Sequence, residues 1–164
     1  METAAMDTLT ETKFRTAMRR LTSTIAIVSA RGEEDTGVLM TSATSLCMDP
    51  PSVLVAVNQK VSAHAAIKAS GLFRVNLLHA DHIALLEPFS GKMKGAERFQ
   101  IGSWSFEADG ARLTDAVASI GCVADGSLDY GSHTIFVGRV TDVVLGDLEH
   151  TLLWREGQSA RTDA

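Results

Sequence analysis

Cysteine and proline are scarce in this sequence, and long apolar runs and basic clusters are missing. The 164 residues include two cysteines and three prolines. Cys47 and Cys122 each sit in an apolar strand pattern, where a buried free thiol is more usual than a disulfide. No apolar run approaches the ~20 residues of a transmembrane helix, and the N-terminus lacks a leader pattern. We therefore expect a cytoplasmic protein that does not bind membranes.

The charge balance also limits the partners of the chain. It has 20 acidic and 15 basic residues, a net charge of −5 and no run of Lys or Arg. Nucleic-acid binding needs a basic surface for the phosphodiester backbone, so we expect no nucleic-acid partner.

Motifs of several common enzyme classes are absent. Neither G-x-G-x-x-G nor G-x-x-x-x-G-K-[ST] occurs, which excludes a Rossmann dinucleotide site and a P-loop. G-x-S-x-G, H-E-x-x-H and paired C-x-x-C are also missing, which disfavours an α/β-hydrolase and a zinc site. His79 and His82 are close in sequence but have no third ligand nearby, so we predict surface histidines and no metal site.

What is present suits one compact domain. Hydrophobic residues make up 45% of the chain and the mean hydropathy is +0.09, enough for one sizeable core. We predict a flexible tail over 1–10, a domain over 11–157 and a C-terminal tail over 158–164.

Strand patterns dominate this domain. A helix is expected to begin at Thr8, with a stripe (Phe14, Ala17, Met18, Leu21) facing the core. Ser62 is expected to cap a second helix over 63–69, and a third is expected to carry Ile83, Leu85 and Leu86. Strands are expected at 24–30, 37–48, 52–57, 72–78, 118–124 and 133–145, with a turn-rich connection over 125–132. Because the pattern has no βαβ rhythm, it indicates a mainly β protein with short helices, an antiparallel barrel or sandwich.

Hydroxyl groups mark the central stretch of the chain, residues 37–64. Thr41, Ser42, Thr44 and Ser45 lie at the end of one strand, and the polar loop 58–60 follows the next. Small hydroxyls and exposed backbone N–H groups can cradle a phosphate-bearing ligand.

Other polar residues have two interpretations each. Asn76 lies in an apolar strand and must find partners if it is buried; a ligand is one, and we include it among the cofactor-binding residues. His133 begins a strand after a glycine-rich turn, where it could face a barrel mouth or bond its own loop. Glu33, Glu34 and Asp35 occupy a hairpin tip, where carboxylates are usually solvated, and we give them no catalytic role.

Five motifs resemble those of the short-chain flavin reductases, which include the reductase components of two-component flavin monooxygenases. They occur in order over residues 14–154. They are F-R-x-A-M (14–18), the hydroxyl-rich strand ending in D-P-P (41–51), F-x-V-N-x-L (73–78), F-S-G…R-F (89–99) and G-S-H-T-I-F-V-G-R-V (131–140).

The resemblance implies an FMN-binding split β-barrel, normally a homodimer, that uses NADH or NADPH to reduce FMN or FAD for a separate monooxygenase. It implies that His133 lies by the nicotinamide. The flavin-binding positions that it implies are Thr41, Ser42, Ala43, Thr44, Cys47, Asn58, Gln59, Lys60, Ser62, Phe89, Lys92 and Arg98. The competing hypothesis is a flavin-binding electron-transfer or sensor module without NAD(P)H turnover, since a fold alone does not fix a function.

Overall fold

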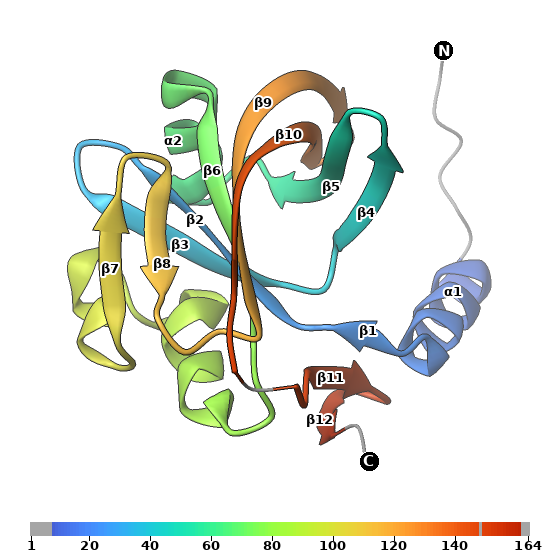
Figure 1. Ribbon diagram of the computed structural model, residues 1–164. Helices are drawn as coiled ribbons and strands as arrows, with labels where there is room; N and C mark the ends of the chain where they lie inside the picture. The colour runs from blue at the N-terminus through green and yellow to red at the C-terminus, as the bar shows by residue number, and fades with distance from the viewer. Residues whose placement is uncertain (1–7, 148, 162–164) are drawn as a thin grey trace.

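A curled sheet of seven strands forms the body of the protein. Figure 1 shows the computed structural model, which describes residues 8–147 and 149–161. All neighbouring strands of this sheet run antiparallel. In spatial order they are β3 (Asp35–Met40), β2 (Ala26–Arg31), β6 (Leu72–Leu77), β9 (Ala118–Tyr130), β10 (His133–Leu145), β5 (Pro51–Asn58) and β4 (Ala43–Met48).

The two edge strands of this sheet, β3 and β4, are consecutive in sequence. Only Thr41 and Ser42 separate them, so the sheet curls back on itself and leaves an open seam between them (Figure 1). The result is an antiparallel barrel split at one seam. This confirms the predicted fold class.

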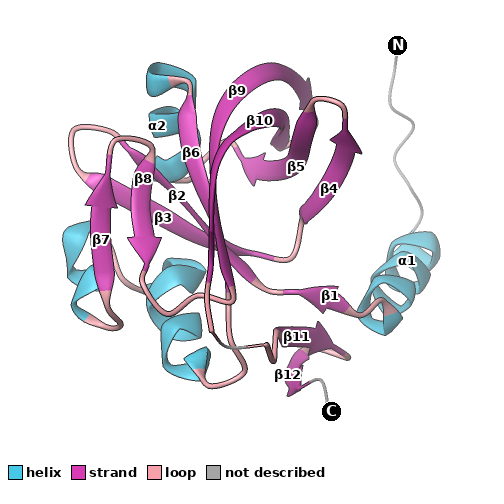
Figure 2. Cartoon of the chain, in the orientation of Figure 1, coloured by secondary structure: helices cyan, strands magenta, loops and turns pink. Residues whose placement is uncertain are grey.

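In the described part of the chain, two small sheets and five helical segments complete the fold (Figure 2). One small sheet joins β1 (Ser23–Thr24), β11 (Leu152–Arg155) and β12 (Gln158–Arg161), and the other pairs β7 (Trp104–Glu107) with β8 (Gly110–Leu113). The helical segments are α1 (Thr8–Arg20), α2 (Ser62–Ser70), η1 (His82–Leu85), η2 (Pro88–Lys92) and η3 (Gly95–Gln100).

Strand β2 separates two hydrophobic cores. Successive side chains of a strand point to opposite faces, so Ala26, Val28 and Ala30 enter one core while Ile27 enters the other. The first core fills the barrel and includes Phe73 and residues of α2. Because both of its faces are covered, β2 is buried from Ala26 to Ala30.

Helix α2 closes one end of the barrel. Ala63, Ala66 and Ile67 are buried at helical spacing. The helix ends at Gly71, whose φ of 69° is the left-handed conformation that glycine adopts without a steric penalty. Ser62 was expected to cap α2, but Val61 holds the capping position; the Ser62 hydroxyl instead lies 2.5 Å from that of Thr36 on β3.

The expectation that α1 packs against the core is wrong for the single chain. No residue of α1 is buried, and Phe14, Met18 and Leu21 are exposed. The helical period correctly shows an apolar stripe, but it cannot show what covers that stripe.

Several predicted boundaries also differ. Strand β9 continues to Tyr130, because residues 126–130 pair with β10, so the turn-rich segment is mostly strand. The predicted C-terminal tail contains β12. Helix α1 begins at Thr8, as predicted, and so overlaps residues 8–10 of the predicted N-terminal tail. The rest of those tails, 1–7 and 162–164, lies outside the described residues.

The two cysteines have different environments. Both are free, as predicted, but only Cys122 is buried; Cys47 is exposed on the edge strand β4, which has no sheet neighbour beyond it to cover the thiol. Burial raises the pKa of the Cys122 thiol to about 12. The prediction of a buried thiol is therefore confirmed for one cysteine and wrong for the other.

Candidate functional site

The link between β3 and β4 lines a first cavity, called here the seam cavity. It has a volume of about 440 Å³ and also touches β5, β1 and the two residues that follow α1, Leu21 and Thr22. Thr41, Ser42 and Thr44 are exposed, so their hydroxyls are open to a ligand, although the Ser42 hydroxyl also donates to the Ala56 carbonyl at 2.8 Å. Its lining residues are Leu21, Thr22, Ser23, Thr24, Thr41, Ser42, Ala43, Thr44, Leu54 and Ala56.

A second cavity of about 370 Å³, called here the cationic cavity, lies at the other end of the segment 37–44. Four of the predicted residues line it: Lys60, Ser62, Phe89 and Arg98. Eight of the predicted flavin residues thus lie in two cavities joined by one strand and its following link, four in each cavity. The other residues of the cationic cavity are Gly37, Val38, Val61, Ser90, Gly91, Met93, Lys94 and Gly95.

Arg98 is the buried charge of the cationic cavity. Its side chain is 7% exposed and bonds only backbone carbonyls, those of Gly37, Met93 and Gly95. Among the described residues it has no carboxylate within ion-pair distance. Burial lowers the pKa of its guanidinium, which still stays charged near neutral pH. A buried cation without a counter-ion on a cavity wall favours an anionic ligand.

Phe89 gives this cavity an apolar wall. Its ring is buried, with its centroid 5.3 Å from those of Phe99, in a T-shaped contact, and of Trp104, in a tilted one. A side chain at position 37 would come within 2.9 Å of Phe89, so Gly37 allows this close packing. The wall is therefore held rigidly by the second core.

His133 lies beside the predicted loop 58–60, although neither lines the seam cavity. It is the register partner of Asn58, and its carbonyl accepts from the Gln59 side chain at 3.3 Å. The His133 ring is exposed, with Nδ1 2.9 Å from the Ser132 hydroxyl. The Asn58 side chain accepts from the Lys60 backbone N–H at 2.9 Å, which shapes the loop that brings Lys60 to the cationic cavity.

Cys47 and Lys92 line neither cavity. The Cys47 thiol contacts the Pro50 carbonyl at 3.2 Å, and the Lys92 ammonium forms an exposed pair with Glu87 at 3.0 Å. Lys94, which lines the cationic cavity, was not among the predicted residues. Both lysines lie in the same basic segment, and the sequence carries no signal that separates them.

The surroundings of Asn76 disagree with the prediction that it binds the cofactor. Asn76 is completely buried, and its amide donates to the carbonyls of Ile27 and Ala111. Its Oδ1 accepts from the Leu113 N–H at 3.0 Å and the Ser119 hydroxyl at 2.7 Å. The protein itself satisfies this side chain, so we assign Asn76 a structural role in place of the predicted ligand contact.

Within residues 8–147 and 149–161, no three His, Cys, Asp or Glu side chains are grouped so that they could hold a metal ion. His82 lies 3.2 Å from Asp115 and is half-buried, and His79 is buried, so the prediction of surface histidines is wrong for His79. In the same part of the chain, no helix combines the length and the apolar character needed to cross a membrane.

Comparisons with known proteins identify the family. The flavin reductase like domain matches residues 18–163. The reductase component of the FADH(2)-dependent resorcinol hydroxylase of Rhizobium sp. is 36% identical over 149 residues, covering 88% of this chain and 83% of that protein. The FMN reductase (NADH) RutF of Agrobacterium fabrum is 34% identical over 157 residues, covering 92% of this chain and 90% of that protein.

A solved structure supports the fold independently. The NADH:FAD oxidoreductase SgcE6 of Streptomyces globisporus superposes with a TM-score of 0.87 over the full length of both chains at 23% identity. At that identity the likeness establishes the split-barrel fold alone. Together with the sequence matches, it shows that this chain belongs to the flavin reductase like domain family.

Proposed function

We propose that the chain is an NAD(P)H:flavin oxidoreductase of the cytoplasm that reduces FMN or FAD by hydride transfer and supplies the reduced flavin to a separate monooxygenase. The family match over residues 18–163 carries this proposal. Relatives named as an NADH-dependent FMN reductase and as reductase components of monooxygenases support both halves of it. The two free thiols are typical of a reducing compartment.

The residues of the two cavities suit a flavin nucleotide. Lys60, Lys94 and Arg98 offer cations for its phosphate, and the exposed hydroxyls of Thr41, Ser42 and Thr44 offer hydrogen bonds to its polar groups. A bound flavin supplies the hydride acceptor of the reaction.

Positioning is what this chain must contribute. Hydride transfer needs the donor carbon of the nicotinamide and the acceptor nitrogen of the flavin to be held ~3–3.5 Å apart. It needs no acid from the protein. A rigid wall such as Phe89 and a loop pinned by Asn58 serve that purpose. The absence of a catalytic triad from the sequence is consistent with this chemistry.

His133 provides the test of nicotinamide binding. With purified protein, NADH or NADPH, and FMN or FAD, we expect flavin-dependent loss of absorbance at the nicotinamide band. We expect His133→Ala to raise the KM for the nicotinamide donor by about tenfold, the loss of roughly one hydrogen bond, while the Kd for flavin changes less than twofold.

Two results would contradict these expectations. Equal loss of flavin and nicotinamide binding in His133→Ala would remove the nicotinamide role of that residue. Tight flavin retention with no oxidation of either donor by the unaltered protein would favour the electron-transfer or sensor module instead.

We also propose that the protein is a homodimer that buries α1. Phe14, Met18 and Leu21 are 59%, 47% and 60% exposed, and Leu46 and Met48 are exposed on the edge strand β4. Exposed apolar side chains on a helix, and an unpaired strand edge that also carries them, are both typical of interfaces. Isologous contact with a second copy would cover them.

A double substitution on α1 tests this dimer. We expect Phe14→Ser/Met18→Ser to be monomeric by sedimentation equilibrium. Flavin binding should also weaken, because Leu21 and Thr22, which directly follow α1, line the seam cavity. Lys13→Ser, on the same exposed helix, should remain dimeric. A monomeric unaltered protein would refute the proposal.

A further inference from the structure

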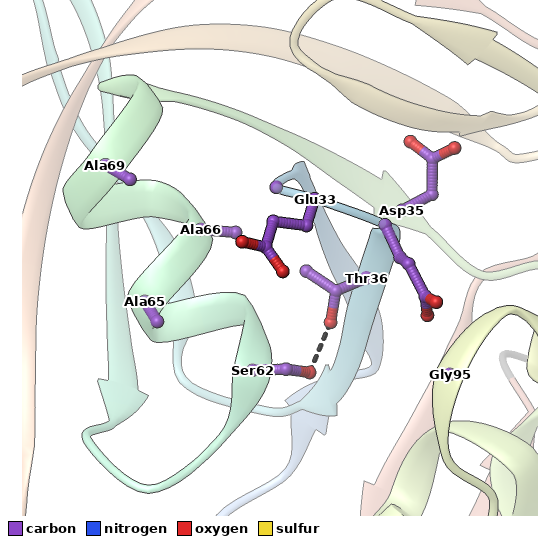
Figure 3. Close-up of a pocket in the computed structure, with 10 residues that line it drawn as sticks. Glu33, Asp35, Thr36, Ser62, Ala65, Ala66, Ala69 and Gly95 are labelled. Carbon is purple, nitrogen blue, oxygen red and sulfur yellow. Dashed lines mark hydrogen bonds between the residues drawn. The ribbon is translucent and has the colours of Figure 1, made fainter.

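A third cavity adjoins the cationic cavity and carries the opposite charge. It has a volume of about 480 Å³ and lies between the tip of the β2–β3 hairpin and α2. Ser62 and Gly95 line both cavities, so the two are neighbours. Figure 3 shows Glu33 facing α2 from the hairpin, above the Thr36 and Ser62 hydroxyl pair. We call it the acidic cavity; it is lined by Gly32, Glu33, Glu34, Asp35, Thr36, Ser62, Ala65, Ala66, Ala69 and Gly95.

The carboxylates of the acidic cavity are not neutralised. Among the described residues, Glu33, Glu34 and Asp35 form no ion pair. Asp35 Oδ1 is buried without a hydrogen-bond partner, which is costly for an ionised oxygen unless a ligand satisfies it. The Glu34 carboxylate lies at the border with the cationic cavity, since a Cβ built on Gly95 would be 3.5 Å from its Oε2.

The cations of the adjoining cationic cavity are also unpaired. Lys60 and Lys94 form no ion pair with any described residue, and Arg98 is buried against carbonyl groups alone. If the two sets of charges served only each other, they would pair. Their separation into two adjoining cavities instead suits a ligand that has phosphates at one end and hydrogen-bond donors at the other.

The adenosine diphosphate half of a nicotinamide dinucleotide has this chemistry. Its ribose hydroxyls can donate to the carboxylates, and its base can lie on the apolar face of Ala65, Ala66 and Ala69. Its diphosphate would share the three cations of the cationic cavity with the phosphate of the flavin. NADPH differs by one phosphate on the ribose 2′-oxygen. Three unpaired carboxylates would repel that phosphate, whereas they would accept the free 2′-hydroxyl of NADH.

We propose that Glu33, Glu34 and Asp35 receive the adenosine ribose of the dinucleotide and make NADH, not NADPH, the electron donor. This inference rests on the proposed function and adds a specificity to it. The three residues act on binding of the donor and not on the transferred hydride. We therefore expect substitutions of these residues to change the KM for each donor and to leave kcat nearly unchanged.

The test compares kcat/KM for NADH and NADPH at saturating FMN. We expect the unaltered protein to prefer NADH at least tenfold, and Glu33→Gln/Glu34→Gln to reduce that ratio by roughly threefold to tenfold, because exposed charges are screened by solvent. Asp35→Asn should shift the ratio in the same direction. Glu97→Gln removes an exposed carboxylate that lines none of the three cavities and should leave the ratio unchanged.

Flavin titrations separate the possible failures. The Kd values for FMN and for FAD, measured by fluorescence without a donor, should be unchanged in Glu33→Gln/Glu34→Gln, whose two positions are exposed and should not affect folding.

A changed FAD-to-FMN affinity ratio with a constant donor ratio would overturn the inference, because the ribose would then belong to the flavin. A preference for NADPH, or an unchanged donor ratio in these variants, would overturn it while leaving the reductase function intact. Failure of the unaltered protein to oxidise either donor would overturn the proposed function itself.

Discussion

Arg98→Met should weaken flavin binding by about 10-fold to 100-fold, the loss of a hydrogen bond to a charged group. Arg98 is 7% exposed and has no carboxylate partner among the described residues, so a phosphate in the cationic cavity would be its counter-ion. In a desolvated site such a charge is screened much less than a surface charge. The measurement is a fluorescence titration of FMN at low and high salt.

Two companion variants make the Arg98 result specific. Lys92→Met should change flavin affinity less than twofold, because Lys92 is exposed, pairs with Glu87 and lies outside the cavity lining. Arg98→Lys should recover part of the affinity, since it keeps the charge but loses the planar set of donors. Because Arg98 also bonds three carbonyls, thermal unfolding of each variant must be followed as well. If Lys92→Met were the weaker binder and Arg98→Met were normal, the cationic cavity would not hold the phosphate.

Asn76→Ala should destabilise the fold by about 3 kcal/mol, because it leaves several buried polar groups without partners. Asn76 joins β2, β8 and β9 through Ile27, Ala111, Leu113 and Ser119, all far from it in sequence. For a chain of this size the loss corresponds to a fall in Tm of roughly 6–12 °C. Flavin affinity of the folded fraction should be unchanged, because no ligand is needed to satisfy the amide.

Asn58→Ala is the matched control, since Asn58 and Asn76 are the only two asparagines of the chain. The Asn58 side chain accepts from Lys60 N–H in a more exposed loop, so its loss should cost less than about 1 kcal/mol. It should instead weaken flavin binding by loosening the loop that carries Lys60. A stable Asn76→Ala with impaired flavin binding would restore the original prediction of a ligand contact.

Pattern alone predicted most of the secondary structure. The strands at 24–30 and 72–78 correspond to β2 and β6 because β-branched and apolar residues with flanking turn residues mark strands locally. The prediction of a turn-rich connection over 125–132 was wrong, and the reason is non-local. Residues such as Gly126 and Asp129 have weak strand propensity, and pairing with β10 overrides it.

The candidate site was only partly predictable. The hydroxyl-rich residues 41–44 do line a cavity, and so do Lys60, Phe89 and Arg98. The choice between Lys92 and Lys94 depends on how the backbone turns at η2 and η3, where Gly91 and Gly95 both have positive φ. The acidic cavity was missed because carboxylates in a hairpin tip look solvated until the position of α2 is known.

The sequence by itself determined the strand pattern, the apolar stripe of α1 and the family, because each depends on residue types at local spacings. The tertiary structure decided which of those groups are buried or meet across the fold. It buried Asn76 among partners from three distant strands, left Phe14 and Met18 exposed, and set three carboxylates beside three cations. Burial and electrostatic pairing depend on neighbours that are distant in the chain, and a single sequence carries no direct record of those neighbours.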